Sequence, residues 1–186
     1  MADSSITKRA LGEALKKLLR TKSFSKICIG EICDLCNMNR KSFYYHFHDK
    51  YELVVWIFES EFLNRIDSRD SESIWRVARE LCDYFYENKH FYKKILQVYG
   101  QNSFSEYFLD ACEAAFTEKI RSKEGFEEIP LFTIELYASY FVLALYKWLK
   151  DDSDKDGAAF FREFVEGIIS GSNLLLASLK EEHFIN

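Results

Sequence analysis

Residues 28–54 read CIGEICDLCNMNRKSFYYHFHDKYELV, and this stretch decides how the N-terminal part of the chain folds. Its first nine residues contain three cysteines in the spacing C-x4-C-x2-C, which some iron–sulfur proteins use. No fourth ligand is near, because the other two cysteines lie far along the chain. Ile29, Ile32, Cys33 and Cys36 have the spacing of one helix face. We therefore predict a helix that buries Cys33 and Cys36, and no metal site.

A turn and a second helix follow the cysteines. Cys28 stands at the start of the first helix, where we expect it to be the most exposed and reactive of the three thiols. Asn37 suits the turn, because asparagine tolerates a left-handed backbone. Asn39 can cap a second helix, in which Phe43 and Phe47 are four residues apart on the inner side. The pattern predicts helix, turn, helix.

Two further helices flank this motif. Asp49 and Glu52 have the spacing of a capping box, in which both side chains bind backbone N–H groups at a helix start. Before the motif, an amphipathic helix is indicated by one apolar stripe. The stripe contains Ile6, Ala10, Leu11, Ala14, Leu15 and Leu18.

The remainder of the chain has helical periodicity throughout. One proline and seven glycines leave few positions for hairpin turns. The long helical runs are 51–65, 73–88, 103–123, 131–150 and 158–179. We predict an all-α fold of about nine helices.

The charge is unevenly distributed along the 186 residues. Residues 1–50 carry ten Lys or Arg and five Asp or Glu, a net charge of +5, whereas the whole chain carries −5. A basic module attached to an acidic domain is typical of proteins that bind a polyanion. We expect residues 1–50 to form a polyanion-binding domain and residues 51–186 a second domain, with a helix at about 49–67 as the link. A solvated basic face without a partner is the alternative on charge alone.

The sequence does not predict export or membrane insertion. Its start is polar and amphipathic, unlike a secretory signal, and charges interrupt every apolar run before about 18 residues. Five cysteines, an odd number, favour free thiols. We expect a cytoplasmic protein.

The segment from Phe24 to Val54 resembles the DNA-binding signature of the TetR (tetracycline-repressor) family of transcription regulators. The run S-F-Y-Y-H-F, followed by Lys50, Glu52 and Leu53, has the family's spacing. The later segments YFYENKHFYKKILQVYGQNSF, LYKWLKD and FFREFVEGI resemble the C-terminal domain of the subgroup that contains the regulator of dihydroxyacetone kinase operons. This resemblance implies a three-helix DNA-binding domain, a larger helical ligand-binding and dimerisation domain, and a dimer that binds a pseudo-palindromic operator in double-stranded DNA.

The second helix of the motif can enter the major groove of DNA. Its first turn supplies Arg40 and Lys41, cations that pair with guanine, and Tyr45 can reach a base edge or a thymine methyl group. The residues expected to hold phosphates are Ser42, Tyr44, His46 and Lys50. For Tyr44 and His46 the alternative is an ordinary, partly buried aromatic residue.

The second domain is expected to bind an effector and to form the dimer. Residues 131–149 are apolar nearly all round, and residues 158–179 carry Gly167 and Gly171, which permit close helix approach. The resemblance implies that these two helices form a homodimer interface; two internal core helices of a monomer are the alternative. It also implies a pocket between the middle helices for an unknown small-molecule or protein effector. Candidates for its lining are Tyr99, Phe104, Tyr107, Phe108, Tyr137 and Tyr140.

A calcium-binding helical interaction protein is an alternative from another class. Residues 152–163 match the D-x-D-x-D-G-x5-E pattern of an EF-hand loop. Its acidic positions are Asp152, Asp154, Asp156 and Glu163. Against this alternative, the chain has no second such loop, and acidic residues before a helix are also explained as caps.

The sequence favours a regulator over an enzyme. It has no P-loop, G-x-S-x-G or H-E-x-x-H motif, and we predict no catalytic residues, no cofactor and no metal. The resemblance implies a repressor that a ligand releases from DNA. An activator that works with a protein partner is the alternative.

Overall fold

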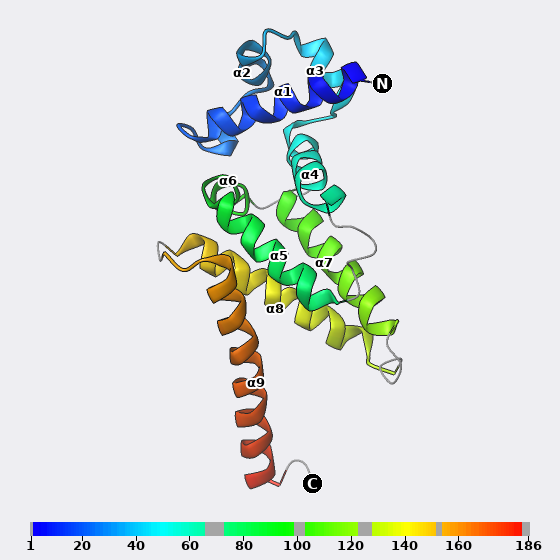
Figure 1. Ribbon diagram of the computed structural model, residues 1–186, viewed down its shortest axis with the longest axis vertical. Helices are drawn as coiled ribbons and strands as arrows, with labels where there is room; N and C mark the ends of the chain where they lie inside the picture. The colour runs from blue at the N-terminus through cyan, green and yellow to red at the C-terminus, as the bar shows by residue number, and fades with distance from the viewer. Residues whose placement is uncertain (1, 66–72, 99–102, 123–127, 152–153, 184–186) are drawn as a thin grey trace.

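The computed structural model describes residues 2–65, 73–98, 103–122, 128–151 and 154–183 (Figure 1). These residues form nine α-helices and two single-turn 3-10 helices, Phe24–Lys26 and Leu63–Arg65, without a strand. The prediction of an all-α fold is therefore confirmed. The helices are α1 Ala2–Leu19, α2 Ile29–Leu35, α3 Arg40–His46, α4 Lys50–Glu61, α5 Ile74–Glu87, α6 Lys89–Ile95, α7 Phe104–Arg121, α8 Leu131–Lys150 and α9 Gly157–Glu181.

Helices α1 to α3 form a group at one end of the molecule (Figure 1). Leu11 and Leu15 of α1, Ile32 of α2 and Phe43 of α3 are fully buried between them. Most of the predicted α1 stripe is confirmed, but the prediction for Ile6 is wrong, because its side chain is 63% exposed. The buried residues of α1 begin one turn later.

Helix α4 joins this group to the rest of the chain. Asp49 caps its start by accepting hydrogen bonds from the backbone N–H groups of Tyr51 (2.7 Å) and Glu52 (2.9 Å). The helix ends at Glu61, earlier than the expected residue 67. Phe62 lies buried just past this end, and its ring stacks on Phe58 of the same helix.

An aromatic core lies between α4, α5, α6 and α7. Phe58, Phe85, Tyr92, Phe104 and Phe108 are all buried, and their ring centroids are between 4.4 and 6.4 Å apart. Neighbouring aromatic rings at these separations attract each other beyond the effect of burial. The short helix α6, which was not among the predicted helical runs, contributes Tyr92 to this core.

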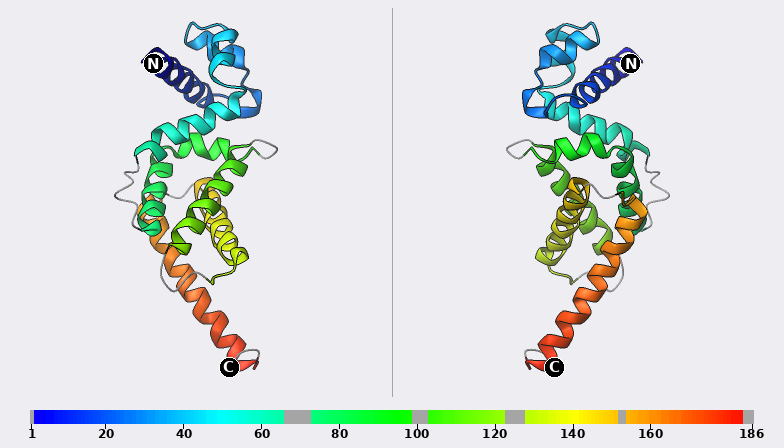
Figure 2. Two further views of the ribbon diagram at one scale, coloured as in Figure 1. Left: turned by 90° about the vertical axis from the view of Figure 1, so that its right-hand side faces the viewer. Right: turned by 90° about the vertical axis from the view of Figure 1, so that its left-hand side faces the viewer.

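Helix α9 has two halves with different surroundings. Its first half lies against α5 and α8, where Phe160 stacks on Trp148 with ring centroids 4.4 Å apart. Asp156 caps the helix by accepting a hydrogen bond from the Ala159 N–H at 2.7 Å. In all three views the second half, ending at Glu181, extends away from the other helices (Figures 1 and 2).

Candidate functional site

The turn between α2 and α3 has the geometry that the sequence predicts. Asn37 has φ 53°, in the left-handed region. Asn39 caps α3, since its Oδ1 accepts a hydrogen bond from the backbone N–H of Ser42 at 2.9 Å. The helix, turn, helix arrangement is confirmed, and the turn determines the direction in which α3 leaves α2.

Helix α3 presents aromatic residues on two sides. Phe43 and Phe47 are buried as predicted, with ring centroids 5.7 Å apart, and Phe47 also contacts the ring of Trp56 in α4. On the outer side, Tyr44 is 57% and Tyr45 85% exposed. The inner rings hold the helix in place while the outer ones face solvent.

Four of the expected DNA contacts line one shallow surface groove, together with a residue of α1. The groove is lined by Thr7, Met38, Asn39, Lys41, Ser42, Tyr45 and His46. Thr7 was missed in the sequence analysis, because no local pattern places the start of α1 beside the second helix of the motif. Tyr44 lies outside this groove.

Arg40 stands at the start of α3, and its guanidinium is directed toward α2. A Cβ atom placed at Gly30 would lie only 2.8 Å from Nη2 of Arg40. Gly30 therefore leaves room for this side chain, which remains exposed.

Lys50 does not have the surroundings expected of a phosphate contact. Its ammonium donates hydrogen bonds to the carbonyl oxygens of Phe24 (2.8 Å), Ser25 (3.3 Å) and Ile27 (2.8 Å). It also lies 4.7 Å from the ring centroid of Phe24. All three donors of the ammonium are thus engaged within the domain. The side chain ties α4 to the loop before α2, and the phosphate contact of Lys50 stays a prediction.

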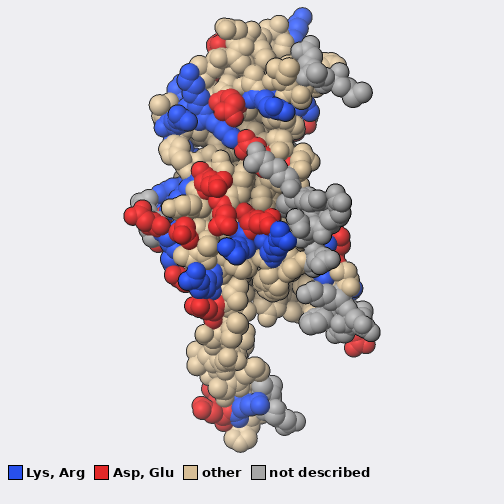
Figure 3. Space-filling model, in the orientation of Figure 1, with Lys and Arg blue, Asp and Glu red and all other residues tan. Residues whose placement is uncertain are grey.

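The exposed side chains around α1 to α3 are predominantly basic. Figure 3 shows Lys and Arg gathered on this end of the molecule, while Asp and Glu gather over the helices next to it. The exposed basic residues are Arg9, Lys17, Arg20, Lys22, Lys26, Arg40 and Lys41. A surface of this kind attracts the phosphates of DNA at long range.

Three of the aromatic residues expected around a pocket belong to the core or its edge. Phe104 and Phe108 are buried, with stacked rings 5.7 Å apart. Tyr107 donates a hydrogen bond from its hydroxyl to Oε1 of Glu59 in α4 at 3.0 Å. Burial and this carboxylate raise the pKa of Tyr107. These residues therefore fill the space between the middle helices.

The other three candidates have separate positions. Tyr140 stacks on Phe164 of α9, with ring centroids 5.4 Å apart. Tyr137 lines a cavity at the end of the molecule far from α3. Tyr99 lies outside the described residues.

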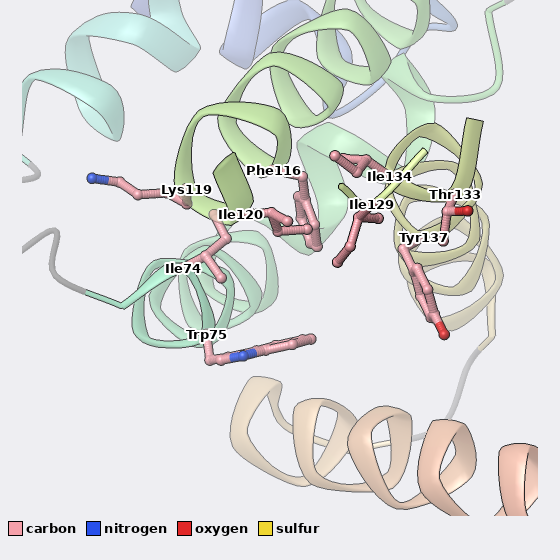
Figure 4. A pocket seen from close by; sticks show the side chains of 9 residues that line it. All are labelled: Ile74, Trp75, Phe116, Lys119, Ile120, Ile129, Thr133, Ile134 and Tyr137. Carbon is pink, nitrogen blue, oxygen red and sulfur yellow. The ribbon is translucent and has the colours of Figure 1, made fainter. Parts of the chain in front are cut away.

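The cavity beside Tyr137 has a volume of about 230 Å³ and lies between α5, α7 and α8 (Figure 4). It is lined by Ile74, Trp75, Phe116, Lys119, Ile120, Ile129, Thr133, Ile134 and Tyr137. The ammonium of Lys119 and the hydroxyl of Tyr137 point away from its centre, so its walls are largely carbon (Figure 4).

Comparison with known proteins agrees with this architecture. The family model described as "Transcriptional regulator C-terminal region", a TetR-type model, matches residues 72–168, just over half of the chain. The chain belongs to the TetR family of transcriptional regulators. The predicted family resemblance is thereby confirmed, and proteins of this family bind DNA and dimerise.

The proteins similar to this TetR-family chain include an activator and a repressor of transcription. The HTH-type dhaKLM operon transcriptional activator DhaS of Lactococcus lactis is 29% identical over 125 residues, which span 67% of this chain and 66% of that protein. The solved structure of the dihydroxyacetone kinase operon activator DhaS has a TM-score of 0.64 at 23% identity, covering 94% of this chain and 97% of that one. NalD, the secondary repressor of the MexAB-OprM multidrug efflux pump in Pseudomonas aeruginosa, has a TM-score of 0.62 at 16% identity, covering 92% and 98%.

A chain of polar groups connects the N-terminal helices of this TetR-family protein to its aromatic core. Lys16 of α1 pairs with Glu61 at the end of α4. Glu61 accepts a hydrogen bond from the hydroxyl of Tyr84 at 3.1 Å, and Tyr84 shares a hydrogen bond of 2.7 Å with the hydroxyl of Tyr92. Burial raises the pKa of Tyr92 well above its usual value. No local sequence pattern predicts this contact, because its members lie on four helices.

A second contact crosses the same boundary. The ammonium of Lys94 in α6 donates a hydrogen bond to the carbonyl oxygen of Leu19, the last residue of α1. A cation at this position also interacts favourably with the helix dipole. Helix α6 and the end of α4 therefore both hold α1.

In the acidic loop before α9, two of the side chains expected to bind calcium have other partners. Asp156 caps α9, and Glu163 forms an ion pair with Lys155. Asp152 lies outside the described residues. Within the described part of the chain, no group of three or more His, Cys, Asp or Glu side chains is arranged to hold a metal ion.

None of the described helices combines enough length with enough apolar character to cross a bilayer.

Proposed function

We propose that this TetR-family regulator is a dimer that binds a pseudo-palindromic operator with α2 and α3 of each copy. Residues 1–50 then form the DNA-binding domain and residues 51–186 the ligand-binding and dimerisation domain, joined by α4. The single observation that carries the proposal is the groove that brings Lys41, Ser42, Tyr45 and His46 together on the outer side of α3.

In this proposal the groove supplies two kinds of contact. Lys41 and Tyr45 are the most exposed of its long side chains, and we assign them to base edges. Ser42 and His46, half-buried beside them, are assigned to phosphates. Arg40 reaches DNA from its position beside Gly30, and Tyr44 contacts the backbone outside the groove.

The homodimer is proposed to form through α8 and α9. Both helices expose apolar side chains, which a monomer in water would leave uncovered. Two-fold pairing of these helices would place the two α3 helices on one side of the dimer, where they can read half-sites about one helical turn apart. We propose a cytoplasmic location, because a regulator must be in the same compartment as the DNA that it binds.

We propose regulation by an effector bound in the second domain, with repression as the first assignment. The polar chain from Lys16 to Tyr92 is a route by which a change in that domain could move α1. Activation is the second candidate, favoured by the similarity to DhaS, an operon activator. We assign the chain no catalytic step.

A selection of genomic fragments by the purified protein at moderate salt tests the DNA-binding proposal. Wild-type protein should enrich one common palindrome, and the double variant Arg40→Ala/Lys41→Ala should not. The double variant Arg121→Ala/Arg162→Ala is the control, because it removes the same charge from exposed positions of the second domain. Failure of the wild type to enrich a common sequence, or equal enrichment by the Arg40/Lys41 variant, would contradict the proposal.

The sign of regulation is tested by transcription in vitro from the promoter beside the selected site. A fall in transcript on addition of the protein identifies a repressor. A rise, with the protein alone or with a partner, identifies an activator.

A further inference from the structure

The second half of α9 presents an uncovered apolar surface. Residues 167–179 contain no charged side chain, and Figure 3 shows this part of the helix without charge until its end. Leu174 is 70% exposed, and Ile169, Leu175 and Leu176 are each about half exposed or more. Within the described part of the chain, a Cβ atom at Gly167 or Gly171 would meet nothing within 4 Å. Ile168 still packs against the core, but beyond it most side chains of this half of α9 are exposed among the described residues.

Helix α8 carries a second apolar surface that is largely uncovered, although the ring of Tyr140 within it also stacks on Phe164 of the same chain. Phe132, Leu136, Tyr140 and Leu143 are exposed, Phe132 to 72%, and their spacing places them along one face of the helix. This stripe is about 17 Å long, and the uncharged stretch of α9 is about 18 Å long, at 1.5 Å per residue. The two surfaces match in length and in chemistry.

The apolar cavity opens beside the α8 stripe. Tyr137, next to Leu136 in the sequence, lines the cavity and is still 42% exposed. Trp75 lines its opposite edge and is 43% exposed. Figure 4 shows Trp75 and Tyr137 at the side of the cavity that faces α9. A helix placed along the stripe would therefore pass the cavity mouth.

We propose that the second half of α9 from a second copy of the chain lies along the α8 stripe and closes this cavity, so that the ligand site is complete only in the dimer. This inference rests on the dimer proposed above. A second copy is the occupant that the observations favour, because a two-fold axis covers both surfaces of both chains with one contact. A different protein covering the stripe would leave residues 167–179 exposed.

The walls of the cavity indicate the class of ligand. A cavity of about 150 Å³ with apolar walls holds one benzene molecule, so the 230 Å³ here suits a molecule with one or two fused rings. Trp75, Phe116 and Tyr137 offer aromatic faces and edges for it. The described residues that line the cavity include no acidic side chain, and the ammonium of Lys119 among them points outward (Figure 4). We therefore assign the site to a small, uncharged aromatic compound.

The arrangement couples the ligand to the assembly. If the partner's α9 forms one wall of the site, a ligand that binds the dimer more tightly than the monomer must strengthen the dimer by the same factor. The effector would then change DNA binding in two ways: by changing the fraction of protein that is dimeric and by changing the conformation of the dimer.

Calorimetric titration with indole as the probe, combined with sedimentation velocity, tests the inference. We expect the wild-type dimer to bind one indole per subunit, and Leu175→Glu to be a folded monomer that binds indole at least tenfold more weakly. Arg162→Glu, a charge change at an exposed position in the first half of α9, is the control and should keep both the dimer and the binding. Trp75→Ala should keep the dimer and weaken indole binding at least tenfold.

Two results would overturn the inference. One is indole binding to monomeric Leu175→Glu as tight as to the wild type, which would show a site complete in one chain. The other is the absence of indole binding to the wild-type dimer, which excludes this ligand class. Neither result affects the operator selection described above, so failure of this inference is distinguishable from failure of the proposed function.

Discussion

Lys41 and Lys50 are both lysines of the N-terminal domain, but their surroundings give them different tasks. Lys41 is exposed in the groove on α3, whereas the ammonium of Lys50 is held by three carbonyl oxygens. Removing a cation that donates to partly buried carbonyls costs stability, because the acceptors lose their partner. Removing an exposed cation mainly reduces the attraction to DNA.

The first prediction separates these two lysines. Lys50→Ala should lower the free energy of unfolding by about 2 kcal/mol, because hydrogen bonds from a charged donor contribute about 1.5–3 kcal/mol. Lys41→Ala should change the free energy of unfolding by less than about 0.5 kcal/mol, as substitutions at exposed positions usually do. If Lys41 contacts a phosphate, the variant should reduce the slope of log affinity against log salt by about one. If Lys41 contacts a base, the variant should instead relax the base preference. Urea unfolding and salt-dependent binding to the selected operator measure both effects. Equal stability of Lys50→Ala and wild type would restore the phosphate role for Lys50.

The second prediction concerns the cysteines of the first quoted helix. Cys28 is exposed and Cys33 is buried, as the helical spacing predicts, whereas Cys36, expected to be buried, is half-buried at the end of α2. Burial also raises the pKa of Cys33 and Cys36, so that less of the reactive thiolate is present at pH 8. Labelling of native protein with a thiol reagent should therefore show one fast residue among these three, and Cys28→Ser should lose that fast phase. Persistence of the fast phase in Cys28→Ser would show that the packing of α2 is different.

At this scale the sequence predicts what local rules determine. Asn37, Asn39 and Phe43 have the positions expected, because a left-handed turn, a cap and an i, i+4 pair depend on neighbours within a few residues. The role of Lys50 was not predictable, since its acceptors lie 23 to 26 residues earlier in the chain. Only the fold brings them together.

Among the helices, the seating of α9 on α5 depends on one glycine. A Cβ atom at Gly157 would lie 2.6 Å from backbone atoms of Cys82 and Asp83, and a backbone cannot move aside as a side chain can. Gly12, where α1 crosses α4, would place its Cβ 3.2 Å from the end of the Ile57 side chain. The two glycines are both buried, but only the first faces rigid atoms.

The third prediction compares these two glycines. Gly157→Ala should lower the free energy of unfolding by about 1–3 kcal/mol, the usual cost of overpacking, because α9 must move away from α5. Gly12→Ala should change it by less than about 1 kcal/mol, since the Ile57 side chain can shift and alanine favours the helix. Chemical denaturation followed by circular dichroism checks both. A neutral Gly157→Ala would mean that α9 does not start against Asp83.

The fourth prediction concerns the contact between α1, α4 and α6. Tyr92→Phe removes one hydroxyl from the buried chain that ends at Lys16, and should cost about 1 kcal/mol of stability. If this chain of hydrogen-bonded groups also positions α1, the operator affinity of the fully folded Tyr92→Phe variant should change. Tyr45→Phe is the comparison: it should change operator affinity without loss of stability. Equilibrium unfolding and operator binding at 10 °C below the melting temperature separate the two effects. Unchanged operator affinity of Tyr92→Phe would limit the chain to a role in stability.

Helix lengths were predicted better where periodicity alone decides them. Helix α8, Leu131–Lys150, agrees with the predicted run 131–150, because a proline precedes it and apolar residues continue through it. Helix α4 ends before its predicted limit, and α6 is separated from α5 by a cap at Asn88. Both breaks occur where the chain turns to bury Phe62 and Tyr92, which depends on helices distant in sequence.

In the whole molecule, the position of the cavity could not be read from the sequence. Phe104, Phe108 and Tyr137 are all aromatic residues at helical spacing, yet the first two fill the core and only the third lines a cavity of ligand size. Aromatic periodicity indicates burial without saying whether the buried face meets another side chain or an empty space. The exposed faces of α8 and α9 have the same ambiguity, which the second copy proposed above would resolve.

The last prediction concerns the spacing of the two DNA-binding units. If α8 and α9 pair two chains about a two-fold axis, the two α3 helices stand at one distance and one rotation about the DNA. Insertion of 5 base pairs between the selected half-sites turns one half-site to the opposite face of the DNA, and binding should fall by at least tenfold. Insertion of 10 base pairs restores the face but lengthens the distance, so it should not restore full affinity in a rigid dimer. Gel-shift titration with Leu175→Glu provides the comparison: a monomer binds each half-site weakly, and its affinity should be the same at every spacing. Spacing-independent binding by the wild type would show that its two units are not held by α8 and α9.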